Sequence, residues 1–113
     1  MTRGELWWAD FGITFGSETG YRRPVLIMQN DAFNESKIRT VVIVPLTTNL
    51  ALADAPGNVY IDKKASGLSK DSVAVVSQLS AIDKRRINDK VGKIEGGILN
   101  EIEEGIKLVL GID

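Results

Sequence analysis

The sequence contains neither histidine nor cysteine. Histidine is the commonest general acid–base catalyst at neutral pH and a frequent metal ligand, and cysteine forms disulfides and thiolate metal sites. Catalysis by these 113 residues must therefore use carboxylates, arginine, lysine, tyrosine or hydroxyl groups. We expect no metal ion and no other cofactor.

Arg23 is the first candidate for a catalytic side chain, and Thr47 is the second. A guanidinium presents a rigid set of N–H donors that matches phosphate oxygens, and it stays charged at any ordinary pH. The Thr47 hydroxyl can donate to a phosphate oxygen as well. Taken alone, Arg23 would be a surface arginine beside a strand, and Thr47 a common strand residue.

Short apolar or alternating runs predict the strands that would position these side chains. The expected strands are residues 5–10, 24–28, 40–45, 58–62, 71–76 with a continuation through 77–82, and 90–94. Residues 11–22 are rich in glycine and predict a long loop, a kind of segment that is usually functional or disordered. Pro45 is expected to end the regular pairing of its strand or to lie at a sheet edge.

A helix is expected at residues 98–110. The aliphatic residues whose spacing of four, four and three places them on one helix face are Ile98, Ile102, Ile106 and Val109. Gly105 lies inside this helix, where glycine costs about 1 kcal/mol relative to alanine, so it indicates close packing. Gly111 is the expected helix stop, and residues 83–86 predict a short helical turn.

Many short strands and one terminal helix predict a mainly β fold with minor α content, a small SH3-like barrel closed by the helix. We expect one domain, residues 1–113, with a core modest enough that dimerisation would help it. Fourteen Lys and Arg against fifteen Asp and Glu argue against non-specific wrapping of nucleic acid, although a local basic groove remains compatible. The sequence has no apolar signal or spanning segment, so we expect a cytoplasmic protein without membrane contact.

Three patches of the sequence resemble the MazF/PemK/Kid toxin family. The first is Arg3-Gly4-Glu5-Leu6-Trp7, and the third is Val44-Pro45-Leu46-Thr47-Thr48. The second and most specific patch runs from Gly16 to Leu26 and is similar to the family signature G-S-E-x-x-x-x-R-P-V-L. Gln78 and Ile82-Asp83-Lys84 also fall where the family has comparable segments, so the resemblance covers nearly the whole chain.

The resemblance implies a PemK/CcdB-type barrel, a homodimer and the toxin role in a type II toxin–antitoxin system. It implies a sequence-specific, metal-independent endoribonuclease that cuts single-stranded mRNA through attack by the RNA's own 2′-hydroxyl. Positioning and electrostatics can lower that barrier without a metal. The implied partner is a MazE-like antitoxin whose flexible, acidic C-terminal segment covers the RNA groove. Arg23 and Thr47 match the family's catalytic residues.

Further residues match or flank these motifs. Glu18 could take the 2′-hydroxyl proton, but a free glutamate titrates near ~4.3 and is a weak base unless its surroundings raise its pKa. A solvated loop carboxylate is an equal alternative. Ser17 and Tyr21 are candidate RNA contacts, Tyr21 by stacking on a base. Arg22 could also stack on a base or contact a phosphate, but it is expected to face solvent.

Three more candidate RNA contacts follow the strands. Thr48 and Asn49 could contact a base edge, with a turn role equally compatible. Gln78 could bond an exposed base edge, as proteins that read single-stranded RNA commonly do, or it could be a buried amide within the barrel. Of the two neighbours Trp7 and Trp8, one ring is expected to pack inward and the other outward.

The sequence departs from the family pattern beside Gln78. Many relatives have Asp or Glu where this chain has Ser77, and Kid-like members have an arginine where it has Val75. Two alternatives therefore stay open: a module that binds RNA or protein without cutting, and a gyrase inhibitor like CcdB. The gyrase activity needs a Trp near the end of the terminal helix, and residues 108–113 contain none.

Overall fold

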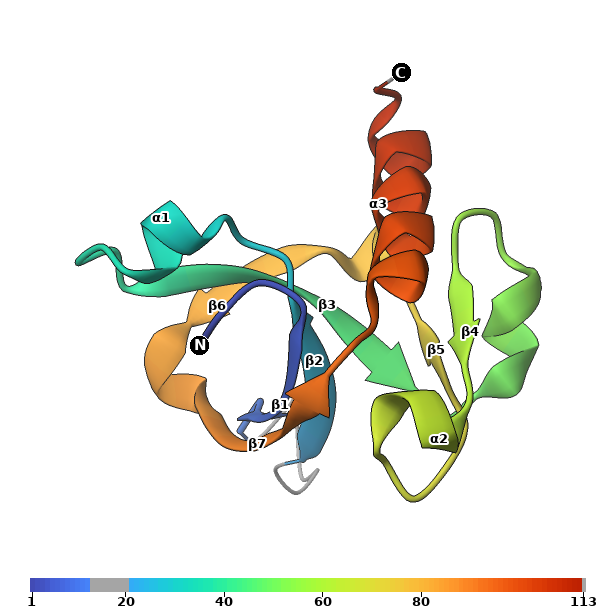
Figure 1. Cartoon of the computed structure of the whole chain (residues 1–113), viewed down its shortest axis with the longest axis horizontal. Helices are drawn as coiled ribbons and strands as arrows, with labels where there is room; N and C mark the ends of the chain where they lie inside the picture. Colours follow the sequence, from blue (N-terminus) through green and yellow to red (C-terminus); the bar gives the residue numbers. More distant parts are fainter. Residues whose placement is uncertain (13–20, 113) are drawn as a thin grey trace.

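Seven strands form one curled sheet in the computed structural model, which describes residues 1–12 and 21–112 (Figure 1). The strands are β1 (Glu5–Asp10), β2 (Arg22–Ile27), β3 (Thr40–Thr47), β4 (Val59–Ile61), β5 (Ser72–Ala74), β6 (Ser80–Asp83) and β7 (Ile87–Lys93). The helices are α1 (Asp31–Asn34), α2 (Lys63–Ser66) and α3 (Gly96–Leu110), with 3-10 turns η1 (Leu50–Asp54), η2 (Val76–Gln78) and η3 (Lys84–Arg86). The predicted mainly β fold with a terminal helix is confirmed.

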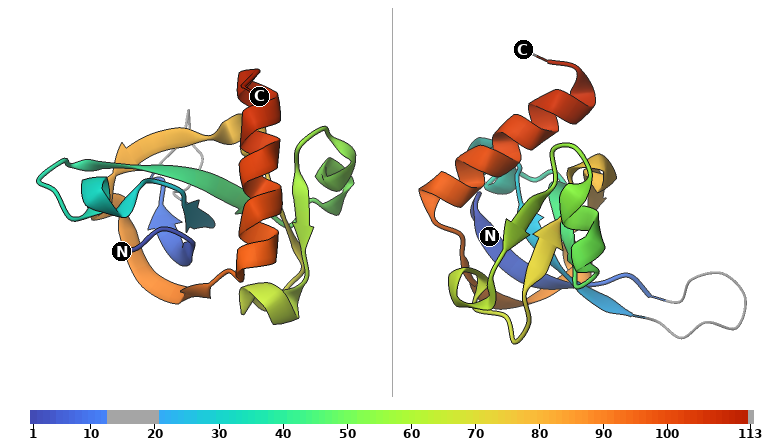
Figure 2. Two further views of the ribbon diagram at one scale, coloured as in Figure 1. Left: turned by 45° about the horizontal axis from the view of Figure 1, so that its top comes forward. Right: turned by 90° about the vertical axis from the view of Figure 1, so that its right-hand side faces the viewer.

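β3 organises the sheet because it has partners along both edges. One edge pairs antiparallel with β2, through Val25 opposite Pro45. The other edge pairs with β6 over its first half and with β5 over its last two residues. The order is β4-β5-β3-β2-β1-β7, with β6 beside β3, so the sheet curls into the partial barrel seen in Figure 2.

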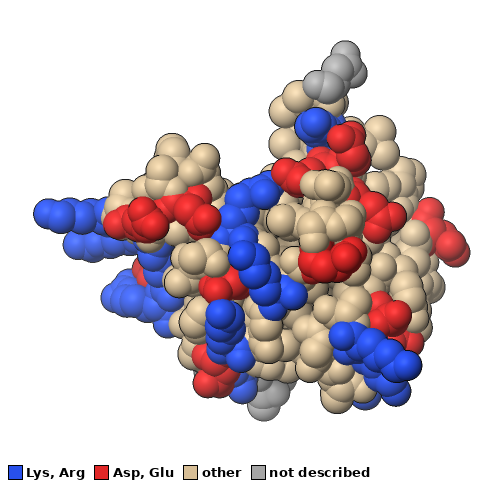
Figure 3. Space-filling view, viewed as in Figure 1, with Lys and Arg blue, Asp and Glu red and all other residues tan. Residues whose placement is uncertain are grey.

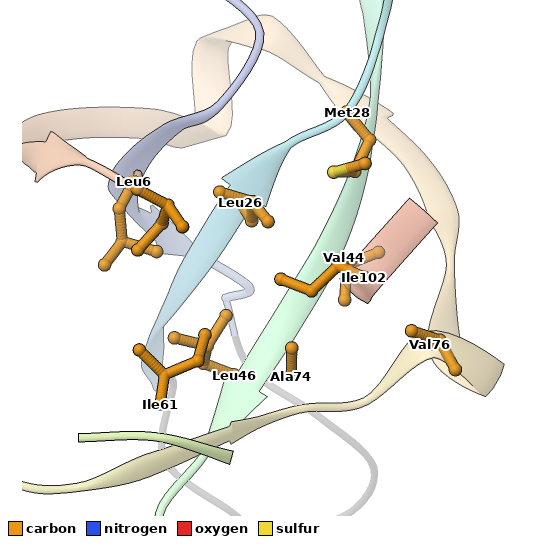
Figure 4. Close-up of a cluster of buried hydrophobic side chains, with 10 residues drawn as sticks. Leu6, Leu26, Met28, Val44, Leu46, Ile61, Ala74, Val76 and Ile102 are labelled. Atoms are coloured by element: carbon orange, nitrogen blue, oxygen red, sulfur yellow. The ribbon is translucent and has the colours of Figure 1, made fainter. Parts of the chain in front are cut away.

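The sheet buries apolar side chains on both faces, because neighbours along a strand point to opposite sides. Figure 4 shows the cluster to which Leu26 and Val44 contribute, which also includes Ile102 of α3. Their strand neighbours Val25 and Ile43 belong to a second cluster, against which residues of β6 and β7 pack. The continuous apolar runs of β2 and β3 therefore supply two small cores rather than one.

Two glycines let α3 lie against the chain before β4. A Cβ added to Gly105 would lie 2.1 Å from the carbonyl oxygen of Gly57, far inside van der Waals contact. This confirms the close packing predicted for Gly105. The helix ends as predicted, because Gly111 adopts the left-handed conformation with φ of 70°.

The strand expected to continue from residue 71 through 82 is interrupted, and that prediction was wrong. β5 and β6 pair with the same edge of β3, but the 3-10 turn η2 separates them. The turn closes through a hydrogen bond from the Leu79 N–H to the Val76 carbonyl. An alternating pattern cannot show this break, because both halves still place apolar residues inward.

Pro45 neither ends β3 nor lies at the sheet edge, contrary to expectation. Its carbonyl accepts from the Val75 N–H on the β5 side, so its own nitrogen faces the same side. That position lies between the β6 pairing, which ends at Ile43, and the β5 pairing, which begins at Leu46. The missing N–H therefore falls where β3 changes partners, and no ladder bond is lost.

The short helices α1 and α2 and the turn η1 were not predicted. Each begins at a side-chain cap: Asn30, Asp62 and Asn49 accept backbone N–H bonds at the three starts. α1 buries no residue, so no hydrophobic periodicity marks it. The structure of the described residues includes no helix long and apolar enough to cross a membrane.

Candidate functional site

The candidate site lies at the junction where β3 leaves β2. The pairing of these strands ends at Val25 opposite Pro45, and the next pair in register would be Pro24 opposite Leu46. Proline has no N–H to give, so it cannot donate to the Leu46 carbonyl. β3 and β2 therefore separate here, while the other edge of β3 pairs Leu46 with Ala74 of β5.

Arg23 supplies the donor that Pro24 lacks. Its Nε and Nη2 lie 3.4 and 3.3 Å from the Leu46 carbonyl oxygen, and its Nη1 lies 3.5 Å from Oε1 of Gln78. These are long hydrogen bonds to neutral acceptors, and no ion pair of Arg23 occurs among the described residues. The half-buried guanidinium is therefore positioned at the junction with its charge available to an anion.

Thr47 ends β3 beside Arg23, and both residues line the same cleft. The Thr47 Oγ1 accepts a hydrogen bond from the Asn49 N–H at 3.2 Å, which leaves its own proton free to be donated. Asn49 caps η1 by accepting from the Ala51 N–H at 3.3 Å, so its turn role is the one observed. Thr48 is exposed and lines the cleft.

Gln78 is exposed at the end of η2, so the alternative of a buried barrel amide was wrong. Its contact with Arg23 brings together two residues that are 55 positions apart in the chain. Ser77 is also exposed, and Val75 is buried. The departures from the family pattern therefore leave a hydroxyl on the surface beside Gln78 and an apolar side chain in the core.

Tyr21 marks the base of the predicted loop. Its ring stacks on Phe11 with 5.5 Å between centroids, and the Phe11 N–H donates to the Tyr21 carbonyl. Tyr21 is 41% exposed, which leaves surface for a further contact. Ser17 and Glu18 lie outside the described residues, so their roles stay predictions.

The cleft has a volume of about 450 Å³ and extends well beyond Arg23. Its described lining residues are Trp8, Arg22, Arg23, Pro24, Leu46, Thr47, Thr48, Leu68, Ser69, Lys70 and Ser72. None of them is acidic, and three are cationic, so the cleft is locally basic although the chain carries a net charge of −1. The cleft is therefore the local basic groove that the net charge of the chain did not exclude.

The far part of the cleft was missed from the sequence. Arg22 is exposed, as expected, and its guanidinium carbon lies 5.3 Å from the centre of the Trp8 ring. Trp8 lines the cleft while Trp7 packs against the second core cluster, so the predicted split of the two rings is confirmed. In the sequence, only the Trp7–Trp8 pair and the arginine at position 22 pointed to this part of the cleft. Residues 68–70 could not be predicted to line it, because they come from a distant segment of the chain.

Carboxylates elsewhere serve structure. Glu5 is buried, which by itself would raise its pKa, but hydrogen bonds from Lys90, Thr2 and Trp7 lower the pKa to about 2.

Within residues 1–12 and 21–112, no three carboxylates are grouped so as to hold a metal ion. Figure 3 shows acidic and basic side chains intermixed on the face that it views.

Comparison with known proteins places this geometry in a family. Residues 2–110 match the family described as PemK-like, MazF-like toxin of type II toxin-antitoxin system. Endoribonuclease MazF6 of Mycobacterium tuberculosis is 37% identical over 112 residues, covering 99% of this chain and 98% of that protein. Endoribonuclease EndoA of Bacillus subtilis is 34% identical over 112 residues, covering 99% and 96%.

Solved structures agree over the full chain. A mycobacterial endoribonuclease in complex with its cognate antitoxin superposes with a TM-score of 0.79 at 25% identity, covering 100% of this chain and 97% of that one. A MazE–MazF structure from Deinococcus radiodurans gives a TM-score of 0.82 at 23% identity, with the same coverage. The chain therefore belongs to the PemK-like, MazF-like family of type II toxin–antitoxin toxins.

Proposed function

We propose that this chain is an endoribonuclease toxin that cuts single-stranded RNA in the cleft containing Arg23 and Thr47. The observation that carries the proposal is the Arg23 guanidinium, which is held at the β2–β3 junction by long bonds to neutral acceptors. A phosphodiester oxygen is a stronger, charged acceptor for the same donors. The naming of the relatives MazF6 and EndoA as endoribonucleases supports it.

In the proposed reaction the RNA supplies its own nucleophile. The 2′-hydroxyl oxygen forms a bond to the neighbouring phosphorus while the bond from phosphorus to the 5′-oxygen breaks. The products are a 2′,3′-cyclic phosphate and a 5′-hydroxyl, so one proton leaves the 2′-oxygen and one reaches the 5′-oxygen. Arg23 stabilises charge on the non-bridging oxygens, and the Thr47 hydroxyl donates to one of them.

The proton acceptor is not among the described residues that line the cleft, since none of those is acidic. Glu18, which falls between β1 and β2 in the sequence, is the acceptor in this proposal. Ser17, Tyr21, Thr48 and Gln78 contact the RNA around the cut, with Tyr21 offering an aromatic face and Gln78 an exposed amide. Asn49 shapes the turn that follows Thr47.

The proposed partner is a MazE-like antitoxin, which would place an acidic, flexible C-terminal segment in the cleft. Arg23 and Lys70 give the cleft the opposite charge, to which Arg22 adds less because it is paired with Asp89. The mycobacterial endoribonuclease solved in complex with its cognate antitoxin supports the partner class. We also propose that the chain forms a homodimer and acts in the cytoplasm, where its mRNA substrate is found.

The test is cleavage of a long single-stranded RNA in EDTA by the purified protein, with fragment ends mapped. Arg23→Ala and Thr47→Ala are compared with Arg39→Ala, a matched arginine at the far end of β3 from Thr47. Discrete cuts by the wild type and Arg39→Ala, lost in Arg23→Ala, are expected. Cleavage that requires added Mg²⁺ would contradict metal independence.

A wild type that cuts no RNA would overturn the proposal. Gyrase inhibition in a supercoiling assay and RNA binding without turnover would then be the functions to measure. A substrate with a 2′-deoxy sugar at the cut position tests the mechanism separately, because it lacks the attacking group. Cleavage of that substrate would contradict attack by the RNA's own hydroxyl.

A further inference from the structure

Arg22 is exposed, yet its guanidinium contacts three other side chains. Its Nη2 lies 2.6 Å from Oδ2 of Asp89 and 2.8 Å from Oδ1 of Asn88. Its guanidinium carbon lies 5.3 Å from the centre of the Trp8 ring. The Asp89 carboxylate offsets part of the Arg22 charge. Arg22 therefore offers the cleft mainly the flat face of its guanidinium group.

β7 is irregular at the residue that holds Arg22. Trp7 pairs with Lys90 and Trp8 with Asn88, so Asp89 is an extra residue between the two pairs. Asp89 has a φ of 48°, which makes it the one described residue other than glycine in the left-handed region. Such bulges re-aim side chains beside functional sites, and backbone strain of this kind points to function.

The opposite wall of the cleft comes from the segment between α2 and β5. Leu68 contributes an apolar side chain, Ser69 and Ser72 contribute hydroxyls, and Lys70 contributes an exposed cation. The cleft is thus a flat-walled, partly apolar space with polar groups at its rim. Its volume of about 450 Å³ is in the range of small-molecule pockets, roughly 300–1,000 Å³.

We propose that this part of the cleft binds one unstacked nucleobase, that of a nucleotide adjoining the scissile phosphate. Arginine planes and aromatic rings are the surfaces on which proteins stack single-stranded bases. Arg22, Trp8 and Arg23 line the same cleft, so a base on the Arg22–Trp8 surface belongs to a nucleotide next to the phosphate on Arg23. This inference rests on the proposed function and adds a specificity site to it.

The proposal assigns separate roles to the residues of the two walls. Arg22 and Trp8 form the stacking surface, and the exposed Ser69 and Lys70 meet the edge of the base. Asp89 is a positioning residue, because it acts on the base only through Arg22. The protein therefore has a preference at one nucleotide position that is independent of the chemistry at Arg23 and Thr47.

The test uses the cut site mapped on long RNA, copied into a short oligonucleotide with a 2′-deoxy sugar at the cut. A fluorescent base analogue, 2-aminopurine or pyrrolocytosine, is placed in turn at each position around the cut and titrated with protein. Quenching at one flanking position is expected. Arg22→Lys keeps the charge but not the plane, so it should weaken binding about tenfold and remove that quenching.

Arg39→Lys is the matched control, since it makes the same change at an exposed site and should alter neither binding nor quenching. Asp89→Asn keeps a residue that tolerates the left-handed conformation. It should raise KM for cleavage several-fold and leave kcat near the wild-type value, whereas a general loss of structure would lower kcat too.

The outcomes separate this inference from the proposed function. A wild type that cuts RNA, with no quenched position or with quenching retained in Arg22→Lys, would overturn the base site and leave the nuclease standing. A wild type that cuts nothing would overturn the nuclease. In that case the analogues are titrated at successive positions of a mixed-sequence RNA, and quenching that depends on the Arg22 plane would still establish base binding.

Discussion

Pro24 and Arg23 act together at the β2–β3 junction. Pro24 has no N–H to donate to the Leu46 carbonyl across the strand pair. The Arg23 guanidinium donates to that carbonyl oxygen in its place. A buried carbonyl needs a donor, which explains why the arginine is drawn to this point. The bonds are long, so an incoming phosphate competes with a weak interaction.

Arg23→Lys is the sharpest test of this arrangement. Lysine keeps the positive charge but offers a compact ammonium instead of a planar set of donors. We expect the rate of the cleavage step to fall about 10²–10³-fold, the cost of losing one fixed oxyanion donor. The measurement is single-turnover cleavage of the mapped site with saturating protein.

Stability provides the control for Arg23→Lys. Losing the bonds to Leu46 should cost about 1 kcal/mol in the free energy of unfolding, read from denaturant titration. A variant that cleaves within about threefold of the wild type would mean that charge alone suffices, and the planar geometry would not be part of the mechanism.

Glu5 makes stability depend on pH. Its pKa is about 2 in the folded protein and about 4.5 when the chain is unfolded. The unfolded chain therefore takes up the proton first, and the stabilisation present above pH ~4.5 is lost as the pH falls towards 2. The shift corresponds to about 3–4 kcal/mol at neutral pH, since one pKa unit is about 1.4 kcal/mol.

Glu5→Gln checks this prediction by comparing denaturant midpoints of both proteins from neutral pH to pH ~3. The variant should be less stable at pH 7, and the difference should shrink on acidification. Other carboxylates with lowered pKa values, such as Asp83, titrate in both proteins and cancel in the comparison. A difference that stays constant with pH would show that Lys90 and Trp7 do not stabilise the charged form of Glu5.

At the scale of elements, α3 depends on its contact with the turn before β4. Gly105→Ala would put a methyl group 2.1 Å from the Gly57 carbonyl oxygen, and both partners are backbone. The helix must shift, so we expect a loss of about 1–3 kcal/mol in the free energy of unfolding, or more. Thermal or denaturant unfolding measures it.

Gly96→Ala is the matched control within α3. A Cβ at Gly96 meets nothing within 4 Å, and its φ is not in the left-handed region. That variant should be neutral or more stable by about 0.4–1 kcal/mol, because alanine restricts the unfolded chain. If both variants behaved alike, packing of α3 against Gly57 would not contribute to stability.

The elements show what a sequence pattern can predict. Alternation and helical spacing gave β1, β4 and α3 within two residues at each end, because each buries one face against a core. The path of β3 through Pro45 was not predictable, since it depends on which strand each edge meets. α1 was missed because it buries nothing and is fixed by its Asn30 cap.

The candidate site, too, was predicted only in part. Arg23, Thr47 and Gln78 were predicted from motifs, and the structure brings Arg23 into contact with Gln78 and into one cleft with Thr47. The Arg22 wall was missed because it needs a bulge at Asp89, 67 positions further on, and no pattern in the sequence marks that bulge.

At the scale of the whole molecule, the end of α3 projects beyond the sheet (Figures 1 and 2). Leu108, Leu110 and Ile112 there are 62%, 55% and 57% exposed. Scattered exposed leucines are ordinary, but large aliphatic side chains gathered at one helix end mark an interaction surface. A second copy of this chain is the occupant in the proposed homodimer, since two such ends can cover one another about a two-fold axis.

Leu108→Glu tests the dimer directly. A carboxylate placed in an apolar interface loses its hydration without gaining a partner, so the variant should be monomeric where the wild type is dimeric. Light scattering coupled to size exclusion measures the mass. The protein concentration, on the order of micromolar, is well above the Kd of a stable interface. Ile38→Glu, which changes an aliphatic residue that is 41% exposed between α1 and β3, should leave the dimer intact. A wild type with the mass of a single chain would refute the dimer, and a dimeric Leu108→Glu would place the interface away from α3.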